Sequence, residues 1–60
     1  MMRFAIADRD GKLCTGDHPS AREAWRELVG ELPDDPDRSR SITLAWVSRG
    51  YRVVDRSQGT

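Results

Sequence analysis

The fold of this 60-residue chain is decided by residues 19–32, which read PSAREAWRELVGEL. The apolar residues of this stretch recur at the spacing of a helix that buries one face, and they are Ala21, Ala24, Trp25, Leu28 and Val29. Ser20 followed three positions later by Glu23 has the form of a capping box, and Gly30 stands where helices commonly end. The stretch therefore predicts the only helix of the chain.

Two strands are predicted before this helix. Residues 2–8 alternate, with Phe4 and Ile6 on one side, and residues 12–15 form a short second strand after a turn at residues 8–12. A two-residue loop would send Leu13 to the covered face. A three-residue loop with a bulge at Gly11 would send Cys14 there instead, and the sequence leaves both registers open.

Two more strands are predicted after the helix. Residues 31–40 hold two prolines and four acidic residues, which predicts an exposed loop. Residues 41–48 alternate as a strand, with Trp46 facing the helix, and the Arg49–Gly50 turn leads into a last strand at residues 51–56. Residues 57–60 carry no structural signal and are expected to fray.

These elements predict a single α+β domain over residues 1–60, a two-layer ββαββ sandwich. Its four-stranded antiparallel sheet would carry the one helix on one face. Trp25 of the helix and Trp46 of the third strand would pack together between the two layers. A chain this short buries only about 60% of its unfolded surface, so a partner or a second copy would add to its stability.

Composition limits the class of protein. Charged residues make up 33% of the chain and hydrophobic ones 37%, and the apolar residues are concentrated in patterned segments, which excludes global disorder. The single cysteine, Cys14, excludes an internally disulfide-bonded miniprotein and favours a reducing compartment. No apolar run is long enough to cross a membrane and no signal peptide is recognisable. We therefore expect a cytoplasmic protein that does not bind membranes.

Charge is balanced overall but uneven along the chain. The net charge is zero, whereas residues 1–37 sum to −4 and residues 38–60 to +4. The simplest interpretation is that the two ends of the chain lie side by side in one sheet, where their charges neutralise each other.

No catalytic or metal-binding motif is complete. Asp8 and Asp10 resemble the start of a calcium loop, but Lys12 and Pro19 stand where that loop needs ligands, so a turn is predicted. The group formed by Cys14, Asp17 and His18 lacks the further ligands or the scaffold that a zinc site or a nucleophilic enzyme requires. We expect a protein without enzymatic activity, metal or cofactor.

Two charged surfaces remain as candidate binding sites. The outward face of the predicted sheet and its neighbouring turn carry Arg3, Arg49, Arg52 and Arg56. The loop before the third strand carries Asp34, Asp35 and Asp37. Arginine on such a face suits a protein interface or phosphate contacts. The leading hypothesis is a module that binds a protein and covers its surface through one of these two sites.

Two alternatives have support. A nucleic-acid-binding domain could use the arginine face, although a neutral chain with a pI near 6.5 is an unusual phosphate binder. A homodimeric structural or regulatory protein could pair Val47 and Val54 with their counterparts. In size, charge polarity and lack of motifs the chain resembles inhibitors from phage and mobile elements, such as anti-CRISPR proteins. That resemblance implies an inhibitor and assigns no residue.

Overall fold

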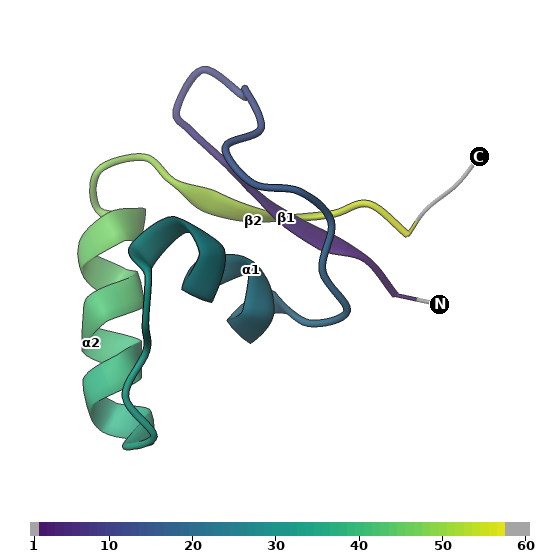
Figure 1. The fold of residues 1–60 in the computed structure, drawn as a ribbon. Helices are drawn as coiled ribbons and strands as arrows, with labels where there is room; N and C mark the ends of the chain where they lie inside the picture. The colour runs from purple at the N-terminus through teal and green to yellow at the C-terminus, as the bar shows by residue number, and fades with distance from the viewer. Residues whose placement is uncertain (1, 58–60) are drawn as a thin grey trace.

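The computed structural model describes residues 2–57 and contains two strands and two helices. In chain order they are β1 (Phe4–Ala7), α1 (Ala21–Val29), α2 (Pro36–Val47) and β2 (Arg52–Asp55). Figure 1 shows the two strands side by side, α1 close to them, and α2 extending away from the sheet. The molecule is flat, with extents of 35 × 25 × 15 Å.

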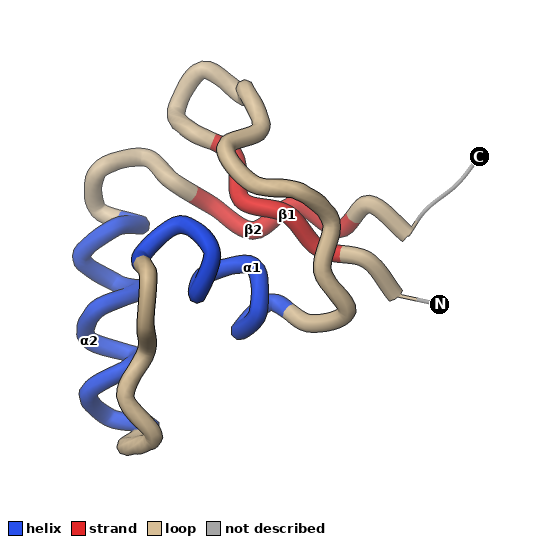
Figure 2. Tube along the Cα trace, in the orientation of Figure 1, coloured by secondary structure: helices blue, strands red, loops and turns tan. Residues whose placement is uncertain are grey.

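The sheet joins the first and last elements of the chain. β1 and β2 pair antiparallel, in a register that sets Phe4 opposite Asp55 and Ala7 opposite Arg52. The interpretation that the two ends of the chain lie side by side is thus confirmed. Residues 8–20 connect β1 to α1, and this connection turns back over the strands (Figure 2).

Part of this connection occupies the other edge of β1. Leu13 and His18 form isolated bridges to Ala7 and Phe4. Between the bridges the ladder is interrupted, and there the Ile6 N–H donates to the Thr15 hydroxyl at 3.0 Å. The side chain of Thr15 therefore replaces a missing backbone acceptor, and both edges of β1 are hydrogen-bonded.

The turn of this connection settles the register that the sequence left open. The Asp8 N–H donates to the Lys12 carbonyl at 2.9 Å, which closes a three-residue loop, and the Asp8 carboxylate accepts from the backbone of Asp10 and Lys12. Leu13 and Cys14 are both exposed. The segment predicted as a second strand at residues 12–15 contributes only the bridge at Leu13.

The predicted four-stranded ββαββ sandwich is wrong, because residues 2–57 form a sheet of two strands and two helices. Residues 41–48, predicted as the third strand, belong mostly to α2. The last strand was correctly located, but its partner is β1 rather than residues 41–48.

Helix α1 forms as its sequence predicts. The Ser20 hydroxyl accepts from the Glu23 N–H at 3.2 Å, and Gly30 ends the helix with a φ of 107°, which favours glycine. Ala24 and Trp25 are buried and pack with Ile6 of β1 and Leu32 into the core. One face of α1 therefore covers the sheet, as predicted.

Helix α2 begins inside the segment predicted as a loop. The Asp35 carboxylate accepts from the Asp37 N–H at 3.0 Å as the N-cap, and Pro36 occupies the first helical position, where a missing N–H costs nothing. Only Ser39 of this helix is buried, while Ile42 and Trp46 reach the margin of the core.

Ser57 is the only residue of the predicted tail that the structure describes, and the expectation that the tail frays stays a prediction. The N–H and hydroxyl of Ser57 both donate to the Asp55 carboxylate, at 2.9 and 2.5 Å. The rest of the predicted tail, residues 58–60, lies outside the described residues.

Candidate protein-binding surface

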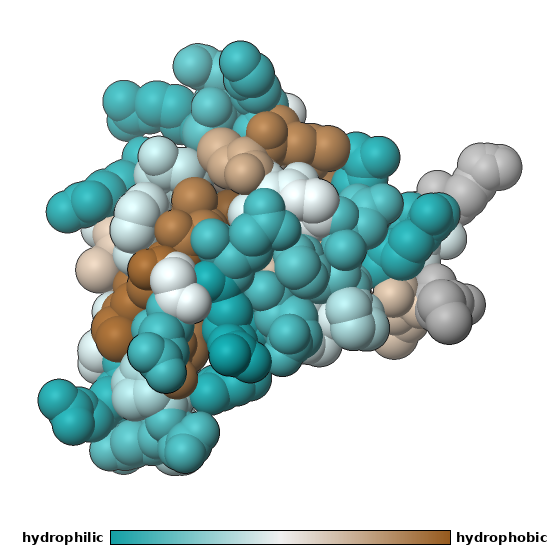
Figure 3. Space-filling view, viewed as in Figure 1, coloured by the Kyte–Doolittle hydropathy of each residue, from teal (hydrophilic) through white to brown (hydrophobic). Residues whose placement is uncertain are grey.

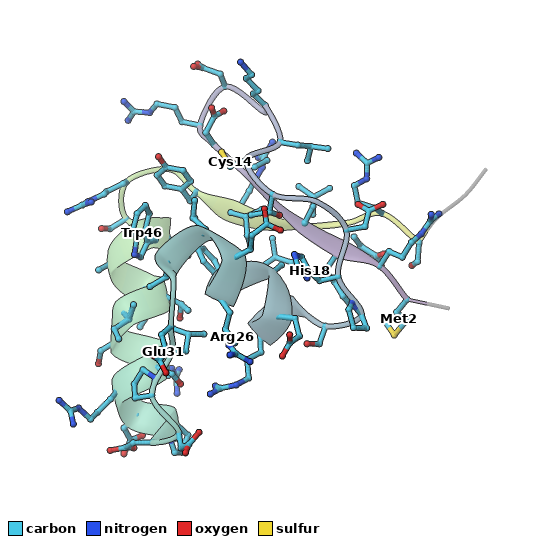
Figure 4. All side chains as sticks on the ribbon, in the orientation of Figure 1. Met2, Cys14, His18, Arg26, Glu31 and Trp46 are labelled. Carbon is cyan, nitrogen blue, oxygen red and sulfur yellow. The ribbon has the colours of Figure 1, made fainter. Side chains whose placement is uncertain are left out.

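An aromatic pair marks the end of α2. The rings of Trp46 and Tyr51 lie edge to face, with centroids 5.2 Å apart, and the Arg49 guanidinium lies 5.5 Å from the centre of the Trp46 ring. Both aromatic residues are half-buried. Trp46 was expected to pair with Trp25 between two layers; instead its ring pairs with Tyr51, because a helix at 36–47 carries it to the margin of the core (Figure 4).

Two more arginines lie near the turn that follows α2. Gly50 is so close to Arg9 that a Cβ built on Gly50 would lie 2.6 Å from the Arg9 Cβ, and Gly50 has a φ of 105°. Arg52 follows in β2, opposite Ala7. We call this group the arginine end; it consists of Arg9, Trp46, Arg49, Tyr51 and Arg52. Among residues 2–57 none of its three arginines forms a salt bridge.

The other two predicted arginines lie at the opposite end of the sheet. The Arg56 side chain pairs with the Asp17 carboxylate at 3.2 Å, and the Arg3 guanidinium donates to the Arg56 carbonyl at 3.5 Å. Arg56 is about 13 Å along the strand from Arg52, at about 3.3 Å per residue. The predicted arginine face is therefore divided, and Asp17 partly neutralises one of its halves.

The three predicted acidic residues lie at the start of α2, about 18 Å along the helix from the arginine end. Asp35 serves as the N-cap and Asp37 lies in the first turn, where acidic residues stabilise a helix. Asp34 lines a shallow hollow of about 450 Å³ together with Glu31, Leu32, Pro33, Arg38 and Ile42. The acidic group thus has a structural role as well as an exposed surface.

Apolar surface is exposed along α2. Leu44 and Val47 are 55% and 45% exposed. A smaller hollow of about 200 Å³ lies between α1 and α2 and is lined by Arg22, Trp25, Leu32, Ser39, Arg40 and Thr43. Figure 3 shows apolar atoms gathered along α2, with hydrophilic atoms around the ends of the molecule. The helix therefore joins the acidic start and the arginine end through a partly apolar surface.

The residues first considered for chemistry do not form one site. His18 points to α1, where its Nε2 lies 2.5 Å from the Glu27 carboxylate, whereas Cys14 lies apart and is exposed (Figure 4). The hydrogen bond from His18 holds the pKa of Glu27 below its ordinary value of 4.5, assisted by the Gly16 N–H. Over residues 2–57 no three His, Cys, Asp or Glu side chains gather as metal ligands.

Sequence reasoning did not include Arg9 and Tyr51 among the binding residues, and it favoured a core position for Trp46 because it assigned residues 41–48 to a strand. The missed signal was Asp35–Pro36, a helix start that would have placed Trp46 in the last turn, next to Arg49 and Tyr51.

Comparisons with protein-family models, curated proteins and solved structures give no match to this chain. Neither helix in the described part of the chain is long and apolar enough to span a membrane.

Proposed function

We propose that this protein is a non-enzymatic binding module that attaches to another protein and covers part of its surface. The observation that carries the proposal is the arginine end, where Trp46 and Tyr51 are held edge to face beside Arg49. Tryptophan, tyrosine and arginine are the residues that most often dominate the binding energy of protein interfaces.

The geometry of this end reduces the cost of binding. Trp46 and Tyr51 are half-buried against each other, so little side-chain freedom remains to be lost on association. Arg49 and Arg52 are exposed, and their guanidinium groups can bind carboxylates in a bidentate manner. The partner surface proposed is therefore apolar at its centre and rich in Asp and Glu around it.

Helix α2 extends the contact. Leu44 and Val47 offer apolar area, and a surface reaching to Asp34 at the start of the helix would meet a basic group on the partner. Covering a partner in this way is how an inhibitor from a phage or mobile element would act, and we propose that role in the cytoplasm.

The first experiment is affinity purification from the native host followed by mass spectrometry. The captured partner is then tested with Arg49→Glu combined with Arg52→Glu. The matched control, Arg3→Glu combined with Arg26→Glu, makes the same change of charge outside the proposed contact, because Arg26 is an exposed residue of α1. We expect at least a tenfold loss of partner capture in the first variant and little change in the control. Equal capture by both folded variants would contradict the proposed contact.

A titration with labelled DNA and RNA tests the nucleic-acid alternative. The acidic start of α2 and a net charge of zero disfavour phosphate binding, so we expect weak binding at physiological salt. Submicromolar affinity that falls steeply with salt and is lost in Arg49→Glu with Arg52→Glu would replace the protein partner by a nucleic acid.

A further inference from the structure

Strand β2 forms an open edge of the sheet. The strand order is β1–β2, and the other edge of β1 is occupied by the segment that carries Leu13 and His18. Of the other elements, β2 packs extensively against β1 alone. An edge strand presents unpaired N–H and C=O groups that can pair with another chain.

The register shows which groups these are. The Arg56 N–H donates to the Arg3 carbonyl at 2.8 Å, so this pair is hydrogen-bonded. Hydrogen-bonded and non-bonded pairs alternate along an antiparallel ladder, so Arg52 and Val54 also bond β1. The backbone groups of Val53 and Asp55 consequently point away from β1, and among residues 2–57 they have no backbone partner.

We propose that this edge binds a second copy of the same chain, with two β2 strands antiparallel and Val53 directly opposite Val53 of the second copy. The pairing would convert two two-stranded sheets into one of four strands. It would also cover the Val53 side chain, which is 37% exposed. The proposal stands whether or not the arginine end binds another protein.

Charge selects this register over its neighbours. In an antiparallel pair, residues whose backbone groups point away from β1 lie opposite one another, and so do those whose groups point toward it. A symmetric register is therefore centred on one of the four residues of β2, namely Arg52, Val53, Val54 or Asp55. A centre at Asp55 sets two aspartates opposite each other. A centre at Arg52 sets two arginines opposite each other, and a centre at Val54 sets Arg52 opposite Arg56. The centre at Val53 sets Arg52 opposite Val54, and Asp55 opposite Tyr51. Among the registers centred on a residue of β2, only this one has no like charges directly opposed.

The strand has four residues, so the shared edge is small and the dimer should depend on concentration. Sedimentation equilibrium of the whole chain over micromolar to millimolar concentrations should show a mass rising toward twice the 6.8 kDa of one chain. A single mass of 6.8 kDa throughout the range would overturn the proposal.

Proline substitution tests whether the backbone groups of β2 that point away from β1 bind the second copy. Val53→Pro removes an N–H that β1 does not use, so we expect the fold to persist and dimer affinity to fall at least tenfold. Val54→Pro is the control, because it removes an N–H that bonds Ala5 and should unfold the chain. A folded Val53→Pro variant that dimerises like the wild type would overturn the proposal.

Cross-linking tests the register without relying on proline. In a Cys14→Ser background, Val53→Cys should form a disulfide-linked dimer on mild oxidation, because paired Cα atoms about 5.5 Å apart suit a disulfide. The matched Val54→Cys variant should give at least tenfold less. A higher yield of disulfide-linked dimer from Val54→Cys than from Val53→Cys would contradict this pairing. So would equal yields from the two variants in buffer, matching the yields in denaturant.

Discussion

Strand β1 lies between two hydrogen-bonded neighbours and beneath α1, whereas α2 extends from the molecule with only Ser39 buried. Ala5, Ile6 and Ala7 are almost fully removed from solvent, and each depends on residues distant in the sequence. Helix α2 depends on local features, namely the Asp35 cap and Pro36 at its first position. Strand β1 is therefore stabilised by tertiary contacts, whereas α2 is stabilised mainly by local features of its own sequence.

The largest difference between the two regions is expected in the unfolding free energy that is lost when an apolar side chain of each is truncated to alanine. Trp25→Ala should cost about 3–5 kcal/mol of unfolding free energy, which is as much as a domain of this size holds. Leu44→Ala, in the exposed surface of α2, should change it by less than about 0.5 kcal/mol. Thermal unfolding by circular dichroism measures both, and similar losses would show that α2 is as deeply packed as the core.

A second pair compares two threonines. Thr15→Val should cost about 1–3 kcal/mol, because the buried Ile6 N–H loses its acceptor while the volume stays the same. The hydroxyl of Thr43 in α2 donates to the carbonyl of Arg40, one turn before it, so Thr43→Val should be close to neutral. Denaturant titrations of both variants test the difference, which should vanish if the Thr15 hydroxyl is replaceable by water.

A third pair compares the two helix caps. Ser20→Ala and Asp35→Ala should each cost about 1 kcal/mol locally. We expect the loss at Ser20 to lower global stability, because α1 covers the core, and the loss at Asp35 to increase amide exchange within α2 alone. Hydrogen exchange read residue by residue distinguishes these outcomes; a uniform change across the chain in Asp35→Ala would show that α2 unfolds only with the rest.

The smallest effect concerns acid. The pKa of Glu27 is lower in the folded chain than the ordinary 4.5, chiefly through the hydrogen bond with His18, so its carboxylate stabilises the fold above about pH 4.5. This contribution should be lost as the pH falls from 4.5 through the lowered pKa. Glu27→Gln should remove it, giving a variant that is less stable at neutral pH and equal to the wild type in strong acid. Stability measured against pH in both proteins checks the sign.

The sequence was sufficient where a pattern had one meaning. The capping box and apolar spacing predicted α1 and its first residue, and alternation located β1. The strand prediction for residues 41–48 was wrong because their pattern fits both structures. Ile42, Leu44 and Trp46 alternate as in a strand and have strand propensity, but Ile42 and Trp46 also lie on one face of a helix. The local start signal at Asp35 decided between them. The arginine end could not be predicted, because it depends on a turn that brings Gly50 against Arg9.

The pairing of β1 with β2 also bears on how fast the chain reaches its native state. Arg3 and Arg56 are bonded neighbours although they are 53 positions apart, so the sheet closes almost the whole chain into one loop. Closing this loop costs conformational entropy before the contacts between the strands form. The chain should therefore fold more slowly than helical domains of the same length. A circular permutant that joins the two ends and opens the chain near residue 33 would make the same strands a local hairpin. Its refolding rate should therefore rise while its native contacts stay the same.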